Sequence, residues 1–225
     1  MSGDDALTTY RGRRHFDRTG EPRGGRAPSE DAPHFVVQIH DATTLHFDFR
    51  LEVDGVLKSW SVPKGPSADP HDKRLAMPTE DHPLEYREFE GVIPAGEYGA
   101  GTVIVWDEGS YRPLPGRKDR GRTFGEALER GHASFWLDGS KLHGGYALTR
   151  FRGGGAGERE AWLLVKENDE RAGDHGAPDA RRARSVLSGR TLGRVVAEAA
   201  GARQTGSARV AGWRAAPAAW EPPSQ

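Results

Sequence analysis

The chain has 225 residues, a formal net charge of −1 and 35% hydrophobic residues, with 30 glycines and 15 prolines, a composition that limits the core and favours short strands and tight turns. It contains no cysteine, which excludes disulfides and thiolate metal sites, so any metal must bind through His, Asp or Glu. No apolar run approaches the roughly 20 residues of a membrane-spanning helix, and the polar residues 1–31 resemble neither a signal peptide nor an anchor, so we expect a cytoplasmic protein.

Composition divides the chain into three parts. Residues 1–33 are rich in Gly, Pro, Arg and Asp and predict a flexible arm. Short apolar runs separated by Gly and Asp predict a folded domain over residues 34–169. Residues 170–225 form a tail rich in Arg, Ala and Pro, which we expect to be largely disordered. Its arginines could also follow a phosphate backbone.

Seven segments of the domain are rich in β-branched and aromatic residues and predict strands. They are residues 36–39, 45–53, 56–62, 102–106, 133–137, 145–151 and 161–166. Turn signals lie between them at residues 54–55, 107–109 and 138–140. One helix is predicted over residues 123–130, closed by Gly131. The predicted fold is mainly β, a compact antiparallel β-barrel or a sandwich, with short helices and flexible N- and C-terminal arms.

The segment 45–62 predicts a hairpin with two different faces, because alternate residues of a strand share a face. Asp54-Gly55 predicts a type I′ turn that pairs Val53 with Val56. The same register pairs Phe49 with Trp60 and Arg50 with Ser59. The apolar face is made by Leu45, Phe47, Phe49, Leu51 and Val53, and the polar face by His46, Asp48, Arg50 and Glu52.

The polar face predicts a metal site. His46 and Asp48 are ligand types about 7 Å apart along the strand, and His40 lies just upstream. Two imidazoles and a carboxylate suit Zn²⁺, Mn²⁺ or Fe²⁺ with open coordination positions. Arg50 shares the face and could bind phosphate or carboxylate beside the metal. The alternatives are a solvated polar strand face and a surface ion pair of Arg50.

Further polar residues follow the hairpin: Lys64 ends it, Arg74 begins a short strand, and Glu80 leads to His82. His82 precedes proline, which favours an extended backbone. It could contact a phosphate oxygen or protonate a leaving group, although a lone histidine is more often structural. Residues 91–101 predict a conformationally demanding glycine-rich loop that lacks the Gly-Lys-Ser/Thr ending of a P-loop.

Together these segments resemble the 3′-phosphoesterase domain of bacterial DNA ligase D and its free-standing relatives. The matching motifs lie at residues 35–38, 40–50, 54–60, 62–66, 80–86, 89–94, 101–107 and 162–166, and residues 185–190 are similar to the segment that follows the domain. The resemblance implies a β-barrel that binds one divalent metal, Mn²⁺ or alternatively Zn²⁺ or Co²⁺, through His40, His46 and Asp48. It implies catalytic phosphate contacts from Arg50, His82 and Tyr86, in a site lined by Gln38, Lys64, Arg74 and Glu80.

The implied reaction clears 3′ ends of DNA or of RNA–DNA primer–templates in two steps. A phosphodiesterase step removes a terminal ribonucleoside, and a phosphomonoesterase step then removes the 3′-phosphate. We expect a monomer that acts at the nucleoid, with separate ligase, polymerase or end-joining proteins as partners. The alternatives are a non-haem iron oxygenase, because two histidines and an aspartate also form its facial triad, and a non-catalytic module that binds nucleic acid or a ligase.

The arm carries a further similarity over residues 10–22. Arg14 and Glu21 match the family's Lys-Arg-Asp-Phe and Glu-Pro stretch and are expected to contact substrate. His15 stands where the family usually has Asp. A neutral histidine cannot supply that negative charge, so this difference bears on substrate preference and on the diesterase step.

Overall fold

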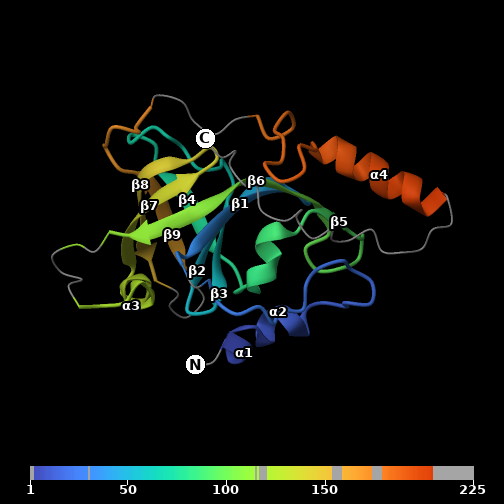
Figure 1. Cartoon of the computed structure of the whole chain (residues 1–225), viewed down its shortest axis with the longest axis horizontal. Coiled ribbons are helices and arrows are strands. Elements are labelled where there is room, and N and C mark those ends of the chain that lie inside the picture. The colour runs from blue at the N-terminus through green and yellow to red at the C-terminus, as the bar shows by residue number, and fades with distance from the viewer. Residues whose placement is uncertain are drawn as a thin grey trace, which may run out of the picture.

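The computed structural model describes residues 3–29, 31–114, 116, 121–153, 159–173 and 179–204. Eight strands close an antiparallel barrel in the order β1-β2-β3-β4-β9-β8-β7-β6, with β6 pairing back to β1 and the short β5 adding to β6 (Figure 1). The strands are β1 His34–Asp41, β2 Leu45–Val53, β3 Val56–Val62, β4 Arg74–Pro78, β5 Gly91–Ile93, β6 Gly101–Pro113, β7 His132–Gly139, β8 His143–Arg152 and β9 Ala161–Lys166. The predicted mainly-β barrel is therefore confirmed.

Short helices accompany the barrel. They are α1 Gly3–Ala6, α2 Thr8–Gly12, the 3₁₀ helix η1 Leu84–Glu88, α3 Phe124–Glu129 and α4 Leu192–Gln204. The helix predicted over residues 123–130 is confirmed as α3, whose Thr123 and Glu126 form a reciprocal capping box. Within the described ranges, no helix is long and apolar enough to cross a membrane.

The predicted hairpin is present with the predicted register. Val53 pairs with Val56, and Arg50 pairs with Ser59. Asp54 and Gly55 have φ values of 49° and 82°, the left-handed backbone that a type I′ turn requires. The turn therefore sets which side chains of β2 share a face.

The turn predicted over residues 107–109 is wrong, because β6 continues through it. The β1–β6 register shifts between Val37 and Gln38, so that one extra residue of β6 forms a bulge. The buried Asp107 carboxylate accepts hydrogen bonds from the backbone N–H groups of Lys141 and Leu142. This aspartate therefore holds the β7–β8 connection against β6, although its residue type resembles a turn signal.

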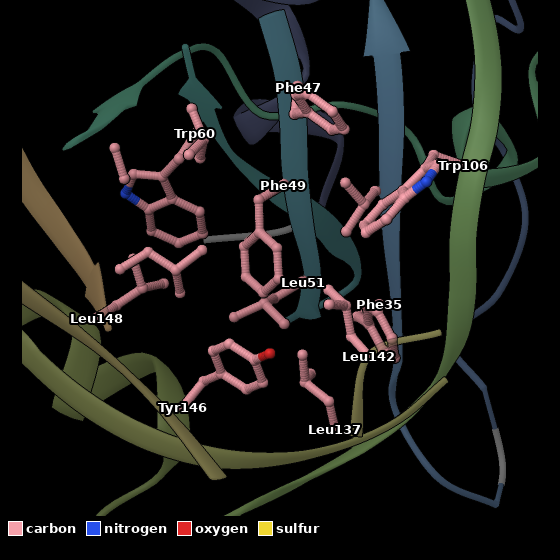
Figure 2. Packing of buried hydrophobic residues seen from close by; sticks show 14 of the residues in the cluster. Phe35, Phe47, Phe49, Leu51, Trp60, Trp106, Leu137, Leu142, Tyr146 and Leu148 are labelled. Carbon is pink, nitrogen blue, oxygen red and sulfur yellow. The ribbon is translucent and has the colours of Figure 1, made fainter. Parts of the chain in front are cut away.

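The barrel interior is filled by the apolar face of the hairpin (Figure 2). Phe49 is fully buried and lies between Phe35 and Phe135, with ring centroids 6.4 and 5.9 Å away. Trp60 meets Trp162 edge-on at 5.9 Å. Because aromatic rings fill the interior, the polar side chains of β2 must lie on the outside of the barrel wall.

A second apolar cluster covers that outer wall. Val36 of β1 and Val105 of β6 pack there with Tyr10 from the arm and with Leu84 and Tyr86 from η1. Helices α1 and α2 lie outside the barrel (Figure 1). The polar face of the hairpin is consequently enclosed between the barrel wall and this outer layer.

The tail also contributes a packed segment. Residues 179–204 carry α4, which contacts β5 and β6 and buries Leu192 and Val195. The backbone N–H of Val186 donates to the carbonyl of Val105 at 2.9 Å. The boundaries drawn at residues 34 and 169 stay a prediction, and the disorder predicted for residues 205–225 lies outside the described residues.

Candidate active site

Three residues of the β1–β2 pair form the candidate metal centre. His40 lies directly opposite His46 in the strand register, and Asp48 follows two residues along β2. One ligand atom from each lies within 4.8 Å of the others. The nitrogen-to-oxygen distances are 3.7 Å from His40 Nδ1 to Asp48 and 3.5 Å from His46 Nε2 to Asp48. Two neighbouring strands therefore bring together the predicted ligand set.

The remaining ring nitrogens show how these histidines are oriented. His40 Nε2 lies 2.9 Å from the carbonyl of Gly99, and His46 Nδ1 lies 2.8 Å from the carbonyl of Thr44. A carbonyl only accepts, so these two nitrogens carry the hydrogens in the neutral rings. The lone pairs then face the Asp48 carboxylate. Three acceptors that converge on one point require a cation, and this donor set fits a divalent metal.

A proton and a metal ion compete for the ligand atoms of His46 and Asp48. Although burial opposes it, the hydrogen bond and charge of Asp48 raise the pKa of His46 above its usual value. The pKa of Asp48 is held well below its usual range, since Arg50 and both histidines outweigh the effect of burial. Metal binding at these residues must therefore displace a proton and weaken as the pH falls.

Arg50 is buried beside the candidate metal ligands, with 2% of its surface exposed. Its Nε donates to Gln38 at 2.8 Å, Nη1 donates to Ser59 at 2.8 Å, and Nη2 donates to Asp48 at 3.0 Å. Two of its five N–H groups remain for an anion. Gln38 is itself held, because its amide donates to the carbonyls of Tyr86 and Phe89.

His82 lies on the other side of Arg50, placed by a backbone bridge to Leu57 of β3. Its Nδ1 is 2.8 Å from the carbonyl of Glu80 and 3.0 Å from Arg50 Nη1, and its Nε2 is 3.4 Å from Arg14 Nη2. Burial and the two guanidinium groups lower the pKa of His82 well below its usual value. The ring is therefore neutral near pH 7, and the Glu80 carbonyl makes Nδ1 the protonated nitrogen.

Tyr86 closes this end of the site from η1. Its ring meets His82 edge-on at 4.6 Å, and the Arg50 guanidinium lies 4.9 Å from the ring centroid. Burial, followed by the charge of Glu21, raises the pKa of Tyr86 well above its usual value. The phenol consequently stays protonated and can act only as a neutral group.

The arm brings Arg14 and Glu21 to the same place. Arg14 Nε donates to Glu21 and Nη1 donates to Glu80, both at 2.8 Å, and all three side chains are buried. The Arg14 guanidinium lies 3.8 Å from the ring centroid of Tyr10. Residues separated by 66 positions, Arg14 and Glu80, therefore meet next to His82.

Lys64 and Arg74 are not joined to this group. Lys64 is exposed just after β3. It follows Val62, which pairs with Phe47, so it lies at the open end of the hairpin, where His46 also lies. Arg74 Nη2 donates to Asp72 at 2.6 Å, and its buried Nε has no hydrogen-bond partner. In the described ranges neither residue makes a hydrogen bond or ion pair to the other predicted site residues.

The loop between β5 and β6 contributes contacts that the sequence did not predict. Gly99 has a φ of 75° and supplies the carbonyl that holds His40. A Cβ on Gly101, where φ is 151°, would lie 2.9 Å from His40 Nε2. The glycine density of residues 91–101 was the available signal, and its cause is the close approach of backbone to His40.

His15 of the arm meets the same loop. Its Nδ1 lies 2.8 Å from Glu97 Oε2, and Arg18 lies 3.6 Å from the other oxygen of Glu97. Position 15 therefore carries no carboxylate of its own but has one in contact. Sequence reasoning could not show this pairing, because His15 and Glu97 are 82 positions apart.

The lowered pKa of His82 predicts acid sensitivity of the fold. The unfolded chain binds the proton of this histidine more readily than the folded protein does, so the free energy of unfolding should fall as the pH drops below about 6.5. One such group contributes at most about 1.4 kcal/mol per pH unit. We expect urea unfolding in EDTA at pH 8.0, 6.0 and 5.0 to show a shallower pH dependence in His82→Gln.

His71, whose side chain is 93% exposed, offers the matched control. His71→Gln should keep the dependence of the unsubstituted protein. The pKa of His34 is also lowered, by burial and by Arg87. This residue therefore makes the same contribution to the pH dependence of unfolding in all three proteins. Identical slopes in the unsubstituted protein and in His82→Gln would contradict a buried neutral His82.

Comparisons with known proteins give consistent matches. The family described as DNA Ligase D 3′-phosphoesterase domain matches residues 38–150. The multifunctional non-homologous end joining protein LigD of Pseudomonas aeruginosa is 49% identical over 197 residues, 85% of this chain and 22% of the relative. The LigD proteins of Mycobacterium tuberculosis and Mycolicibacterium smegmatis are 45% and 40% identical, each over 74% of this chain and 20% and 21% of their own length. The chain spans about a fifth of the length of these relatives.

Proposed function

The chain belongs to the DNA ligase D 3′-phosphoesterase domain family, and from this premise we propose that it hydrolyses phosphate esters at the 3′ ends of DNA strands during end joining. The observation that carries the proposal is one continuous cluster of polar side chains. It links the metal-ligand set to Arg50, His82 and Arg14. Two guanidinium groups beside a metal site suit a phosphate, whose oxygens gain charge during hydrolysis.

We assign His40, His46 and Asp48 as the ligands of one divalent cation, Mn²⁺ or alternatively Zn²⁺ or Co²⁺. When bound, the cation acts as a Lewis acid on a phosphate oxygen. Their donor set supports this assignment, because two neutral imidazoles and one carboxylate neutralise only part of a dipositive charge. The centre therefore keeps its attraction for an anionic substrate.

Arg50 orients the phosphate in this proposal. Its Nε and one N–H of each terminal nitrogen are held by Gln38, Ser59 and Asp48, which fixes the guanidinium plane. The two remaining N–H groups bind non-bridging oxygens bidentately. Preorganised donors of this kind stabilise the charge that develops while water attacks phosphorus.

His82 and Tyr86 complete the contacts. The Glu80 carbonyl occupies His82 Nδ1, so Nε2, which lies 3.4 Å from Arg14 Nη2, is the nitrogen left to contact substrate. A phosphate placed next to Arg50 and Arg14 offsets the charges that depress the pKa of His82, so the imidazole can then carry a proton at Nε2 and donate it to a phosphate or leaving oxygen. The protonated phenol of Tyr86 serves as a neutral donor.

The proposed reaction has two hydrolytic steps. In the first, water attacks the phosphodiester and the bond to the 5′-oxygen of the terminal ribonucleoside breaks, which leaves a 3′-phosphate. In the second, water attacks that monoester and leaves a 3′-hydroxyl with free phosphate. Glu97, in contact with His15, supplies a carboxylate beside the position where the family usually has Asp, which supports retention of the first step.

The test uses labelled primer–templates that end in one 3′-ribonucleotide or in a 3′-phosphate. Each is incubated with the protein and Mn²⁺, Zn²⁺, Co²⁺ or EDTA, and products are resolved by electrophoresis. Metal-dependent conversion of both ends to a 3′-hydroxyl is the expected result. Removal of the phosphate alone would restrict the proposal to the monoesterase step. DNA affinity without turnover under any metal would replace it with a non-catalytic binding module.

Two facts favour phosphate chemistry over the iron oxygenase alternative. The chain belongs to a phosphoesterase family, and the side chains of Arg14, Arg50 and His82 are buried together in the site. Oxygen uptake with 2-oxoglutarate and Fe²⁺ should therefore be absent. We further propose that ligase and polymerase activities of the end-joining process act on the 3′-hydroxyl product.

A further inference from the structure

Tyr98 is an exposed aromatic residue held at the edge of the candidate site. It is 47% exposed. Its hydroxyl donates to Glu80 Oε2 at 3.2 Å and accepts from Arg13 Nη1 at 2.8 Å. The next residue, Gly99, holds His40 through its carbonyl at 2.9 Å. Tyr98 is therefore fixed between a metal ligand on one side and Glu80 with its neighbour His82 on the other.

The environment of the ring suits a nucleobase. The Arg13 guanidinium lies 4.9 Å from the ring centroid, and that of Arg14 lies 5.5 Å away. Bases stack on tyrosine rings and on guanidinium planes. Because the hydroxyl is already tethered at the tip, the ring loses little conformational freedom when a base binds.

The surrounding charges select which part of the substrate lies here. Glu80 is paired with Arg13 at 2.6 Å and with Arg14 at 2.8 Å, and Glu97 lies 3.6 Å from Arg18 Nη1. Charges on this side thus offset one another. A continuing strand adds a phosphate with every nucleotide and is attracted by cations that lack such partners. In the described ranges Lys64, on the side of His46, is exposed without an ion pair.

We propose that Tyr98 is a specificity residue that stacks on the base of the 3′-terminal nucleoside. The proposal rests on the proposed function and adds to it a subsite for the leaving nucleoside on the side of the arm. The terminal nucleoside carries no further phosphate, which suits a region of paired charges. The rest of the strand extends toward Lys64.

Binding to two matched ends tests the subsite. One labelled primer–template ends in a ribonucleoside, and the other ends in the same ribose without a base; both are titrated by fluorescence anisotropy in EDTA, which prevents turnover. The unsubstituted protein should bind the first about tenfold more tightly, as expected for one base on one aromatic ring. Tyr98→Ala should reduce this ratio to about one, and Tyr98→Trp should keep it. Phe151→Ala supplies the matched control, since Phe151 is an aromatic residue of β8 with 52% exposure.

Each outcome has a defined meaning. Equal affinities for the two ends in the unsubstituted protein, or an unchanged ratio in Tyr98→Ala, would overturn the subsite. An equal loss of affinity for both ends in Tyr98→Ala would also overturn it. It would show that Tyr98 only holds the arm in place through Arg13. A base preference that depends on Tyr98, without hydrolysis of either end under Mn²⁺, Zn²⁺ or Co²⁺, would support the subsite and refute the proposed enzyme. Hydrolysis without that preference would refute only the subsite.

Discussion

Asp48→Asn is expected to lower the rate of metal-dependent hydrolysis by about 10³-fold, because it removes the carboxylate that both histidines face. The lone pairs of His40 and His46 converge on Asp48 at 3.7 and 3.5 Å. Asparagine has nearly the same shape and still offers an oxygen to Arg50, but it supplies no negative charge to a cation. Affinity for Mn²⁺ and turnover should therefore fall together.

Equilibrium dialysis with Mn²⁺ and initial rates on a 3′-phosphate end measure the two effects. Asp138→Asn is the matched control, because the Asp138 side chain is 76% exposed and belongs to β7, away from the metal ligands. Circular dichroism should show that both variants keep their strands. Normal Mn²⁺ affinity in Asp48→Asn would show that the metal is bound by other residues.

The hairpin could be predicted from the sequence because two local rules agree there. Alternation along residues 45–53 separates apolar from polar side chains, and Asp54-Gly55 fixes the register by its positive φ values. Both rules act within a few residues. They place His46, Asp48 and Arg50 on one face without any knowledge of the rest of the chain.

Burial of that polar face could not be predicted by the same rules. The face is covered by the arm and by η1, and the contacts that hold this layer join distant positions, such as Arg13 with Tyr98, 85 residues apart. Neither residue type nor spacing indicates which charged groups will meet across such a distance. The turn predicted at Asp107 failed for a related reason, since the partners of its carboxylate lie on the β7–β8 connection.

Enclosure changes the chemistry of the residues that were predicted. On an open strand face, Arg50 and Asp48 would form an ion pair of little consequence. Buried beside two histidines, the same pair sets the pKa of Asp48 low and contributes to the low pKa of His82. The arm therefore acts on the site through electrostatics as well as through contact, since Arg14 is the second cation beside His82.

Arg50→Lys should lower the hydrolysis rate by about 10² to 10³-fold although it keeps the positive charge. The guanidinium donates to Gln38, Ser59 and Asp48 at once, and a lysine ammonium cannot reach these acceptors in one plane while it also binds two phosphate oxygens. Each buried acceptor left without a donor costs about 1–3 kcal/mol, so the free energy of unfolding should fall as well. Steady-state rates on a 3′-phosphate end and urea unfolding measure the two losses.

Arg194→Lys separates the geometry of the site from a general effect of the substitution, because the Arg194 side chain is 69% exposed on α4 and its partner Glu198 is also accessible. It should retain the rate and the stability of the unsubstituted protein. A folded Arg50→Lys variant that loses less than about tenfold in rate would show that charge alone is sufficient at this position. The planar shape of the Arg50 guanidinium, held by Gln38 and Ser59, would then have no part in binding phosphate. The larger loss is expected because these two neighbours leave the guanidinium a single orientation, with its two remaining N–H groups available to substrate.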